Sequence, residues 1–467
     1  MPSCLLQYPP HFHAENYTFG HIMRVGTSYR QIWKISAPIM IGSAAQNLIA
    51  LTDSVFLYHR SEEDFAAIGF VGVFYLVIAA IGFGFSRGGQ IMIARRAGEQ
   101  RFGEIGRTFY SMLYFELALA LVMYLFMQYG CYYFFSLIVD SPIIYAKSLE
   151  YLEYRSWGVF FSYAGVAIIA LYTGIARPVF IIVDTLILAA LNIVLNYSLV
   201  FGHWGFPAMG IGGAALASSI SEVVALVIFV IYMLLDKKAH TYNLFKLPNI
   251  DMALIRQQYS LALPIVVQAF VGLGSWFFFF GIVENLGERA LAITNLARMV
   301  YLILSIPCWG FASGVNTMVS NLIGQQKRQA VVPIIQKTAT LCLGVTMLLA
   351  IPVVVFPKQM LYPLLGSQDM SLITDAQPIF YLLIVILATF AVGGVFFNGL
   401  AGTGATYYGL KIQTVCAAAY VLYIYIEVNY TSGGLFWAWA VEIFYWLVLI
   451  FLTIRYLKSK EWYVLKV

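Results

Sequence analysis

The chain repeats part of itself at a fixed shift in residue number. Pro38 lies in the tripeptide Ala-Pro-Ile, and Pro264, 226 positions further on, lies in Leu-Pro-Ile. The same shift relates two more pairs of motifs: GFxxG at 84–88 and 310–314, and GEQ at 98–100 with GQQ at 324–326. A single shift shared by three motifs indicates two homologous halves, so any fold for this chain must be built from two copies of one unit.

The composition places both copies in a membrane. Hydrophobic residues make up 61% of the 467 residues and charged residues 10%, whereas soluble domains carry about 25% charged residues. The apolar runs are long enough to cross a bilayer as helices. We predict twelve spans, at 31–57, 64–92, 105–130, 145–173, 178–201, 208–235, 252–283, 290–322, 332–356, 372–400, 405–428 and 433–457.

Six spans in each half is an even number, so both halves enter the membrane from the same side as parallel repeats, an arrangement typical of transporters. The predicted fold is therefore an all-α integral membrane protein of two six-helix lobes. The predicted segments are an N-terminal segment (1–30), the first lobe (31–235), a linker (236–251), the second lobe (252–457) and a tail (458–467).

Arginine and lysine fix the predicted orientation. They are concentrated in the loops after the even-numbered spans and in the tail, for example Arg95, Arg96, Lys237, Lys327 and Lys458. Because positive loops stay in the cytoplasm, we predict that both termini are cytoplasmic, in a multi-pass protein of the plasma (inner) membrane. The net charge of +5 is modest, and we expect a lipid bilayer but no nucleic acid as a partner.

No motif predicts a cofactor, a structural metal or an enzyme. The five cysteines are scattered without CxxC spacing, and no histidine lies in the middle of a span. The repeated GxxxG motifs have neither a preceding strand nor a following Gly-Lys-Ser/Thr, which argues against a phosphate loop. We predict instead that these glycines allow two helices to pack closely.

Several motifs, taken in order, resemble the multidrug and toxic compound extrusion (MATE) family. The resemblance covers about residues 31 to 462. It is carried by Pro38, Gln46-Asn47 and Asp53-Ser-Val-Phe, by the glycines of the second span with Ala94-Arg-Arg-Ala-Gly98, by Asn192-Ile-Val-Leu-Asn196, Gly210-Ile-Gly-Gly-Ala-Ala, Asn316-Thr317, Gly399-Leu-Ala-Gly402 and Glu442.

This resemblance implies two lobes around a central V-shaped cavity. It also implies export of amphipathic or cationic organic compounds in exchange for inward flow of H⁺ or Na⁺, by alternating access of the two lobes. We expect a small organic molecule as substrate, H⁺ or Na⁺ as the coupling ion, no cofactor, and a monomer as the functional unit.

Asp53 is the strongest candidate for the cation-coupling residue. A carboxylate inside a span is costly and is therefore a functional hypothesis by default. The shift of 226 places Phe279 at the corresponding position, so the acid belongs to one half only. The family resemblance also implies a cation-coupling carboxylate there. The alternative is an acid at the outer end of the span, solvated or paired with Arg60.

Three further polar residues are predicted to lie at the depth of Asp53. Asn192 and Asn196 are four residues apart and share one helix face. Ser218, about ten residues into the next span, reaches a similar level. Together with Asp53 these groups could form a hydrogen-bonded proton site or an oxygen cage for Na⁺. The alternative is amide packing between helices.

Secondary candidates are Asp184, Glu222 and Glu442. Glu222 and Glu442 are related by a shift of 220, close to that of the other repeats, which suggests a structural role common to both halves, such as a polar contact near the lobe interface. Glu116 is a fourth span carboxylate, without an assigned role. The regions of the seventh and tenth spans, Val266–Gly274 and Leu387–Gly393, hold no acid, so a cation site in the second half is not expected.

Two other functions have different residue requirements. A flippase or exporter of a lipid-linked saccharide or other lipid, from the same superfamily, needs several basic residues in its cavity. Away from the span ends the chain offers Arg298, Arg155 and Arg87. A membrane-embedded enzyme needs a histidine or a metal cluster within the spans, and the sequence provides neither.

Overall fold

The first lobe follows from the first six apolar runs. The computed structural model describes residues 25–360, 370–431 and 434–465, so most of the predicted N-terminal segment (1–30) and the end of the predicted tail lie outside the described residues. The N-lobe consists of α1 (Tyr29–Arg60), α2 (Glu62–Gly98), α3 (Gly103–Leu125), α4 (Cys131–Ser136), α5 (Pro142–Arg155), α6 (Gly158–Gly174), α7 (Val179–Phe201) and α8 (Gly210–Leu235).

The second lobe repeats this order. The C-lobe consists of α9 (Met252–Glu284), α10 (Glu288–Leu304), α11 (Ile306–Gly324), α12 (Val331–Val355), α14 (Met370–Gly402), α15 (Thr406–Tyr430) and α16 (Gly434–Ser459). Within the described residues ten helices, α3 and α4 counted as one, can each cross a membrane, and α5–α6 and α10–α11 form bent pairs. Counting each bent pair as one span gives the twelve spans that the sequence predicts.

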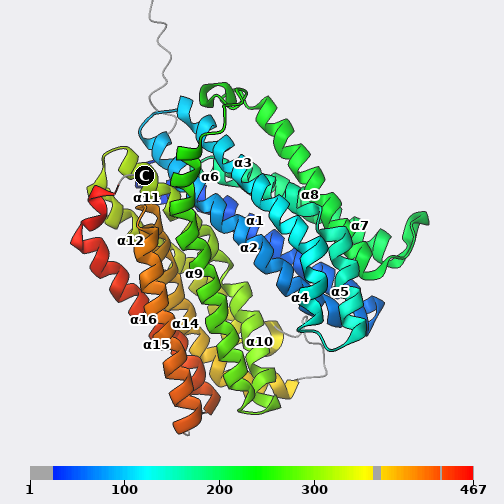
Figure 1. Cartoon of the computed structure of the whole chain (residues 1–467). Helices are drawn as coiled ribbons and strands as arrows, with labels where there is room; N and C mark the ends of the chain where they lie inside the picture. The colour runs from blue at the N-terminus through cyan, green and yellow to red at the C-terminus, as the bar shows by residue number, and fades with distance from the viewer. Residues whose placement is uncertain (1–24, 361–369, 432–433, 466–467) are drawn as a thin grey trace, which may run out of the picture.

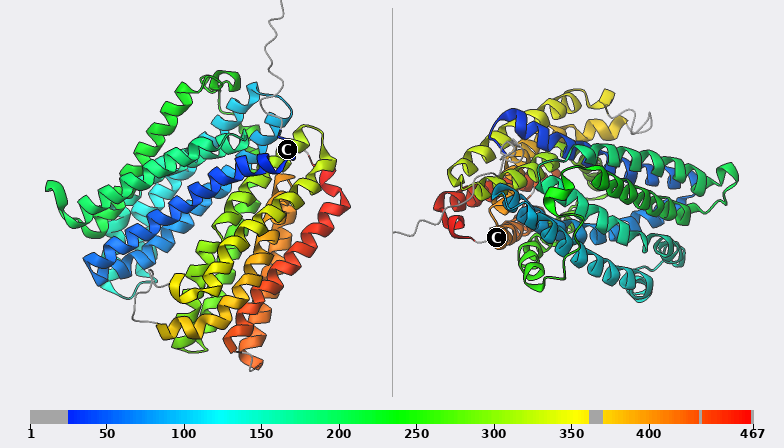
Figure 2. Two further views of the ribbon diagram at one scale, coloured as in Figure 1. Left: turned by 180° about the vertical axis from the view of Figure 1, so that it is seen from behind. Right: turned by 90° about the horizontal axis from the view of Figure 1, so that it is seen from above.

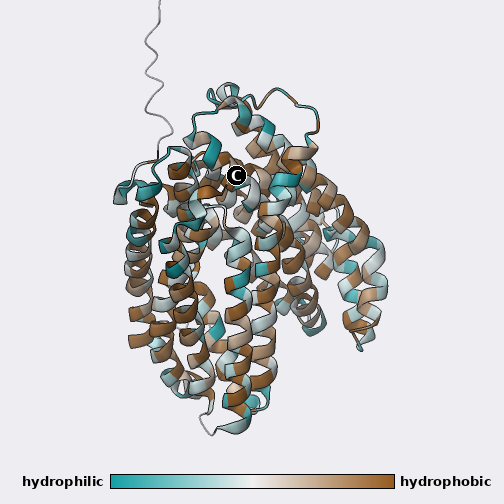
Figure 3. Ribbon diagram, turned by 60° about the vertical axis from the view of Figure 1, so that its left-hand side comes forward, coloured by the Kyte–Doolittle hydropathy of each residue, from teal (hydrophilic) through white to brown (hydrophobic). Residues whose placement is uncertain are grey.

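The two lobes meet at one end and diverge toward the other (Figure 1), and the view from behind shows the same arrangement (Figure 2). We call the end that holds Gly98, Gly324 and the C-terminus the joined end, and the opposite end, where α1 gives way to α2, the open end. Hydrophobic residues cover the sides of the helices, and hydrophilic ones gather near the joined end (Figure 3).

The repeated glycines hold the lobes together. A Cβ added to Gly84 or Gly88 of α2 would lie 2.6 Å from Val266 Cγ2 or 2.8 Å from Ala262 Cβ, both on α9. On the other side of the interface, Cβ atoms on Gly310 and Gly314 of α11 would collide with Met40 and Ser36 of α1. The repeat shift of 226 carries Met40 and Ser36 onto Val266 and Ala262. The prediction of close helix packing at these glycines is confirmed, and the contacts run between lobes.

The next pair of repeated glycines lies at the joined end. Gly98 and Gly324 pack against each other, and a Cβ on either would lie 3.1 Å from the Cα of the other. Side chains of α11 then bond to α2: Gln90 Nε2 donates to Thr317 Oγ1 at 2.8 Å, and Ser320 Oγ donates to the Ile91 carbonyl at 2.7 Å. Only glycine allows this approach of two helix backbones, so the interface depends on the duplicated motifs.

Candidate cation site of the N-lobe

Asp53 lies inside the N-lobe near the open end of α1. It is seven residues before the end of the helix, and its side chain is 9% exposed. α7 packs along α1, and α8 packs along α7. These neighbours bring the three other predicted residues, Asn192 and Asn196 of α7 and Ser218 of α8, to the same place.

The four side chains form one hydrogen-bonded group. Asn196 Nδ2 donates to Asp53 Oδ1 at 2.6 Å, and Ser218 Oγ donates to Asp53 Oδ2 at 3.1 Å. Asn192 Nδ2 donates to Ser218 Oγ at 3.0 Å, and Asn196 Nδ2 also lies 3.0 Å from Asn192 Oδ1. Asn192 and Asn196 are fully buried. Each carboxylate oxygen therefore has a donor, an arrangement that suits an ionised acid.

One acceptor in this group is left over. Asn196 Oδ1 is buried and has no hydrogen-bond partner among the described residues. A buried polar atom without a partner costs free energy and calls for an explanation. Flipping the amide end over end exchanges Oδ1 and Nδ2, which would give a proton on Asp53 an acceptor. The unpaired oxygen thus fits a site that changes its protonation or takes up a cation.

An ion pair that the sequence reasoning did not predict lies beside the site. Arg155, the last residue of α5, donates to both oxygens of Glu222 of α8 at 2.6 and 2.5 Å. Its guanidinium also lies 4.0 Å from the ring centre of Tyr75 and 3.4 Å from Ser219 Oγ. Ser219 follows Ser218, so the ion pair adjoins the Asp53 group. The helix break between α5 and α6, which are bent by 57°, follows Arg155 directly.

The expected interface role of Glu222 and Glu442 is wrong. Glu222 pairs with Arg155 inside the N-lobe. Glu442 of α16 accepts hydrogen bonds inside the C-lobe from Tyr420 Oη at 3.1 Å and Trp446 Nε1 at 3.2 Å. Both acids find their partners within their own lobe because each faces the interior of its helix bundle. They therefore satisfy local polar groups and do not link the lobes.

The remaining span carboxylates lie outside the Asp53 group. Asp184 of α7 is 3% exposed, and its Oδ1 has no partner among the described residues. Glu116 of α3 is fully buried and accepts a bond from Ser86 Oγ at 2.7 Å, while its Oε2 has none in the described part of the chain. Position within the span suggested their burial, but nothing in the sequence identifies the partner of Glu116.

The chemistry of the Asp53 group limits what it can hold. Within the described ranges no three histidine, cysteine, aspartate or glutamate side chains come together as a metal site. The oxygens of Asp53, Ser218, Asn192 and Asn196 lie together, and oxygen atoms are the ligands that hard cations take in proteins. A proton needs only the carboxylate and one acceptor. The residues therefore suit a hard monovalent cation or a proton.

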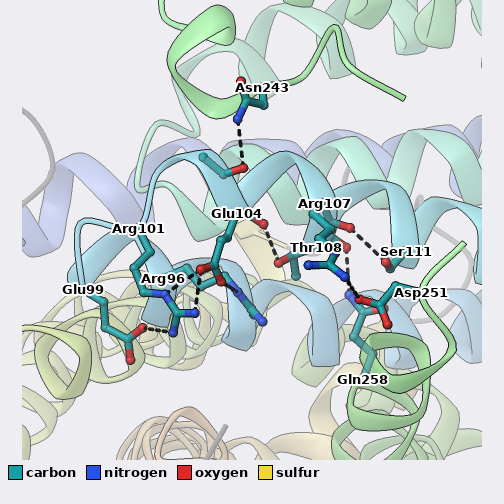
Figure 4. Close-up of polar contacts among 11 residues, drawn as sticks. Arg96, Glu99, Arg101, Glu104, Arg107, Thr108, Ser111, Asn243, Asp251 and Gln258 are labelled. Atoms are coloured by element: carbon teal, nitrogen blue, oxygen red, sulfur yellow. Dashed lines mark hydrogen bonds and ion pairs between the residues drawn. The ribbon is translucent and has the colours of Figure 1, made fainter. Parts of the chain in front are cut away.

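A second polar network ties the lobes at the joined end (Figure 4). Arg107 of α3 forms an ion pair of 2.6 Å with Asp251, which accepts bonds from the first turn of α9 as its cap. Gln258 of α9 donates to the Thr108 carbonyl at 2.9 Å. These contacts attach the start of the C-lobe to α3, close to the glycine interface.

Known proteins share the sequence pattern of this chain. A sequence model described as MatE matches residues 38–198 and 264–426, two segments that begin at the two repeated prolines, Pro38 and Pro264. A protein from Synechocystis named "Probable multidrug resistance protein NorM" is 28% identical over 354 residues, 73% of this chain and 74% of its own length.

Solved structures share the fold. The outward-facing structure of a multidrug resistance MATE family transporter of the MOP superfamily superposes with a TM-score of 0.84 at 20% identity, over 92% of this chain and 95% of the other. A MOP superfamily transporter from Pyrococcus furiosus, described as having a binding pocket of reversed polarity, gives 0.83 at 20% identity over 92% and 95%.

Proposed function

This chain belongs to the MatE family of multidrug efflux transporters, a family of multi-pass membrane proteins, and we propose that it exports amphipathic organic compounds, cationic ones included, in exchange for H⁺ or Na⁺. The observation that carries the proposal is the Asp53 group, a buried carboxylate with a donor on each oxygen and an unpaired amide oxygen beside it. The relatives are named for drug resistance, and this points to transport rather than catalysis.

In the proposed cycle the cation binds Asp53 while the open end faces outward. Neutralising the carboxylate weakens the charge-assisted bonds from Asn196 and Ser218. Because these two residues belong to α7 and α8, a change in their bonding alters how both helices pack against α1. That coupling between ion occupancy and helix position is what an antiporter requires.

Alternating access then follows from the glycine interface. The structure joins the lobes at the end that the charge pattern assigns to the cytoplasm, with both termini on that side in the proposed orientation. The outward-open state therefore needs the contacts at Gly84, Gly88, Gly310 and Gly314. An inward-open state must separate α2 from α9 and α1 from α11. We propose that a single chain in the plasma (inner) membrane performs this rearrangement, with no cofactor.

The test uses purified protein in liposomes that carry a fluorescent cationic dye and only one imposed ion gradient. We expect dye export to be driven either by the pH gradient alone or by the sodium gradient alone, because the Asp53 group is a single site that binds one kind of ion. The protein reconstituted with neither gradient serves as the control. Export that is equally fast with no gradient, or that needs ATP, would contradict an antiport mechanism.

A further inference from the structure

Arg87 is a span arginine with an incomplete set of partners. It lies on α2, 11 residues before the end of the helix, which is about 16 Å inside that end at 1.5 Å per residue. Its guanidinium crosses from the N-lobe to the C-lobe, where Nη1 donates to Asn398 Oδ1 of α14 at 2.7 Å. An arginine at such depth is costly to insert and is a functional candidate by default.

Most of the hydrogen-bonding capacity of this guanidinium is unused. A guanidinium has five N–H donors, and the described structure gives Arg87 one protein acceptor. The Nε of Arg95 is buried and has no hydrogen-bond partner among the described residues. Each side-chain nitrogen of Arg87, in contrast, either has a partner or remains in contact with solvent. The side chain of Arg87 is half-buried, so its free N–H groups remain accessible between the lobes.

The surroundings of Arg87 contain no compensating charge. In the part of the chain that the structure describes, Arg87 forms no ion pair, and its one hydrogen bond goes to the neutral amide of Asn398. Four of the five span carboxylates named above are at most 9% exposed inside a lobe, and the fifth, Glu222, is paired with Arg155. Arg155 therefore has its own counter-charge, and Arg87 does not.

A second span arginine, Arg298, also lacks a counter-charge among the described residues. This exposed side chain lies ten residues into α10, contacts the Phe280 ring at 5.2 Å, and has no ion-pair partner among the described residues. An arginine that faced hydrocarbon at that depth would be unfavourable, so we place it toward water between the lobes. Arg298 is therefore a second span arginine without a counter-charge in the described part of the chain.

We propose that Arg87, with Asn398 beside it, binds the carboxylate or phosphate of an amphipathic organic anion or zwitterion carried by the transporter. The proposal rests on the proposed export function and narrows its substrate class away from purely cationic compounds. A planar guanidinium suits a two-oxygen anion because it can donate two parallel bonds. At about 16 Å from the end of α2, Arg87 lies deeper than a lipid headgroup, which resides at the membrane surface, so its depth favours a dissolved solute.

The test is equilibrium binding to the purified full-length protein in detergent, with no ion gradient. The probes are dansylglycine, which carries a carboxylate, and dansylglycinamide, its neutral counterpart. We expect the wild-type protein to bind the carboxylate at least about tenfold more tightly, as for a charge-assisted hydrogen bond. Arg87→Gln should reduce that preference to within about twofold, and Arg87→Lys should keep part of it.

Asn398→Asp provides a second variant that keeps the arginine. A carboxylate placed 2.7 Å from Nη1 would neutralise Arg87, so the preference should again disappear. The matched control is Arg101→Gln, an exposed arginine at the joined end, which should retain it. Thermal unfolding of each variant verifies folding.

Three results would overturn the inference. The first is a wild-type protein without preference for the carboxylate. The second is an equal loss of affinity for both probes in Arg87→Gln, which would make Arg87 a latch between the lobes. The third is displacement of dansylglycine by dioctanoyl phosphatidylglycerol at a concentration at which phenyl phosphate, a phosphate without acyl chains, leaves it bound, which would assign the site to a lipid. None of them bears on ion coupling, because binding is measured without a gradient, and failed gradient-driven export would leave this site intact.

Discussion

The two lobes share one backbone plan but have different interiors around equivalent positions. Asp53 of the N-lobe is hydrogen-bonded to α7 and α8. Its counterpart Phe279 in the C-lobe is 1% exposed and lies edge-on to Trp439 of α16, with ring centres 5.4 Å apart. Phe279 also contacts Tyr420 of α15 at 6.2 Å. One lobe thus fills this place with a carboxylate group and the other with an aromatic cluster.

The helix breaks also lie at different positions in the two lobes. α2 runs unbroken over 37 residues, but its repeat, α10–α11, bends by 44° just before Pro307. Proline is tolerated there because the first N–H groups of a helix lack intrahelical partners. The residue 226 positions before Pro307 is Ile81, which imposes no break. In the N-lobe the break lies instead between α5 and α6, where it positions Arg155.

These differences distinguish residues that hold the lobes together from residues that are candidates for ion binding. Features present in both lobes, such as the interface glycines, determine how the lobes meet. Two features belong to a single lobe: the Asp53 group, and the pairing of Glu222 with an arginine, since its repeat mate Glu442 accepts bonds from Tyr420 and Trp446 instead. We therefore propose that the coupling ion binds in the N-lobe and that the C-lobe interior has a mainly structural role.

The largest effect on stability is expected at the Arg155–Glu222 pair. Glu222→Gln leaves the guanidinium of Arg155 buried without a counter-charge, and removing one partner of a buried pair costs about 3–5 kcal/mol. Thermal unfolding in detergent should show this loss. The double variant Arg155→Met/Glu222→Met should recover most of it, because it buries no charge. Equal stability of Glu222→Gln and wild type would mean that the pair is solvated.

The next largest effect distinguishes the two halves of the glycine interface. Gly88→Ala places a Cβ 2.8 Å from Ala262 Cβ and 3.0 Å from a backbone oxygen, so the helices must move apart at about 1–3 kcal/mol. Gly314→Ala meets the side-chain oxygen of Ser36, which can rotate away. We expect the Gly88 variant to be the less stable of the two. The reverse order would show that the contact between α1 and α11 is the more rigid one.

A smaller effect is expected for Glu442 of the C-lobe. Glu442→Gln keeps an oxygen for Tyr420 or Trp446 and loses about one hydrogen bond, or about 1 kcal/mol. Gradient-driven export should remain above about half of the wild-type rate, since the bond is structural. Complete loss of export in a folded Glu442→Gln protein would show that a carboxylate of the C-lobe takes part in ion coupling.

The smallest effect is expected at the ion pair between Arg107 and Asp251. The Arg107 side chain is 61% exposed, and exposed pairs contribute about 0–1 kcal/mol. Arg107→Gln should therefore leave the unfolding temperature nearly unchanged in high salt. A large loss of stability would show that this contact, rather than the glycines, joins the lobes.

The sequence contained most of the fold and part of the site. Twelve apolar runs and the shift of 226 predicted the spans and the glycine packing, because both patterns are local or repeat at a fixed distance. The depth argument placed Asn192, Asn196 and Ser218 near Asp53, since helix rise converts residue number into depth. Strict use of the shift pairs Asn196 with Leu422, yet the structure places Tyr420 beside Phe279.

The partners of Arg155 and Glu222 could not be predicted from spacing. They depend on a bend between α5 and α6 and on the rotation of α8, neither of which a hydropathy pattern encodes. The expected interface contact of Glu222 was wrong for the same reason. Depth along a span is readable from sequence, whereas the direction in which a side chain points depends on how the helices pack.

Asp53→Asn tests most directly whether Asp53 binds the coupling ion. The amide keeps the size of the side chain and removes its charge and its ability to take up a proton. Export of a dye by this variant in liposomes, under whichever gradient drives the wild-type protein, should fall below about a tenth of the wild-type rate, with unfolding temperature retained. Export at more than half of the wild-type rate by a folded Asp53→Asn protein would contradict the account.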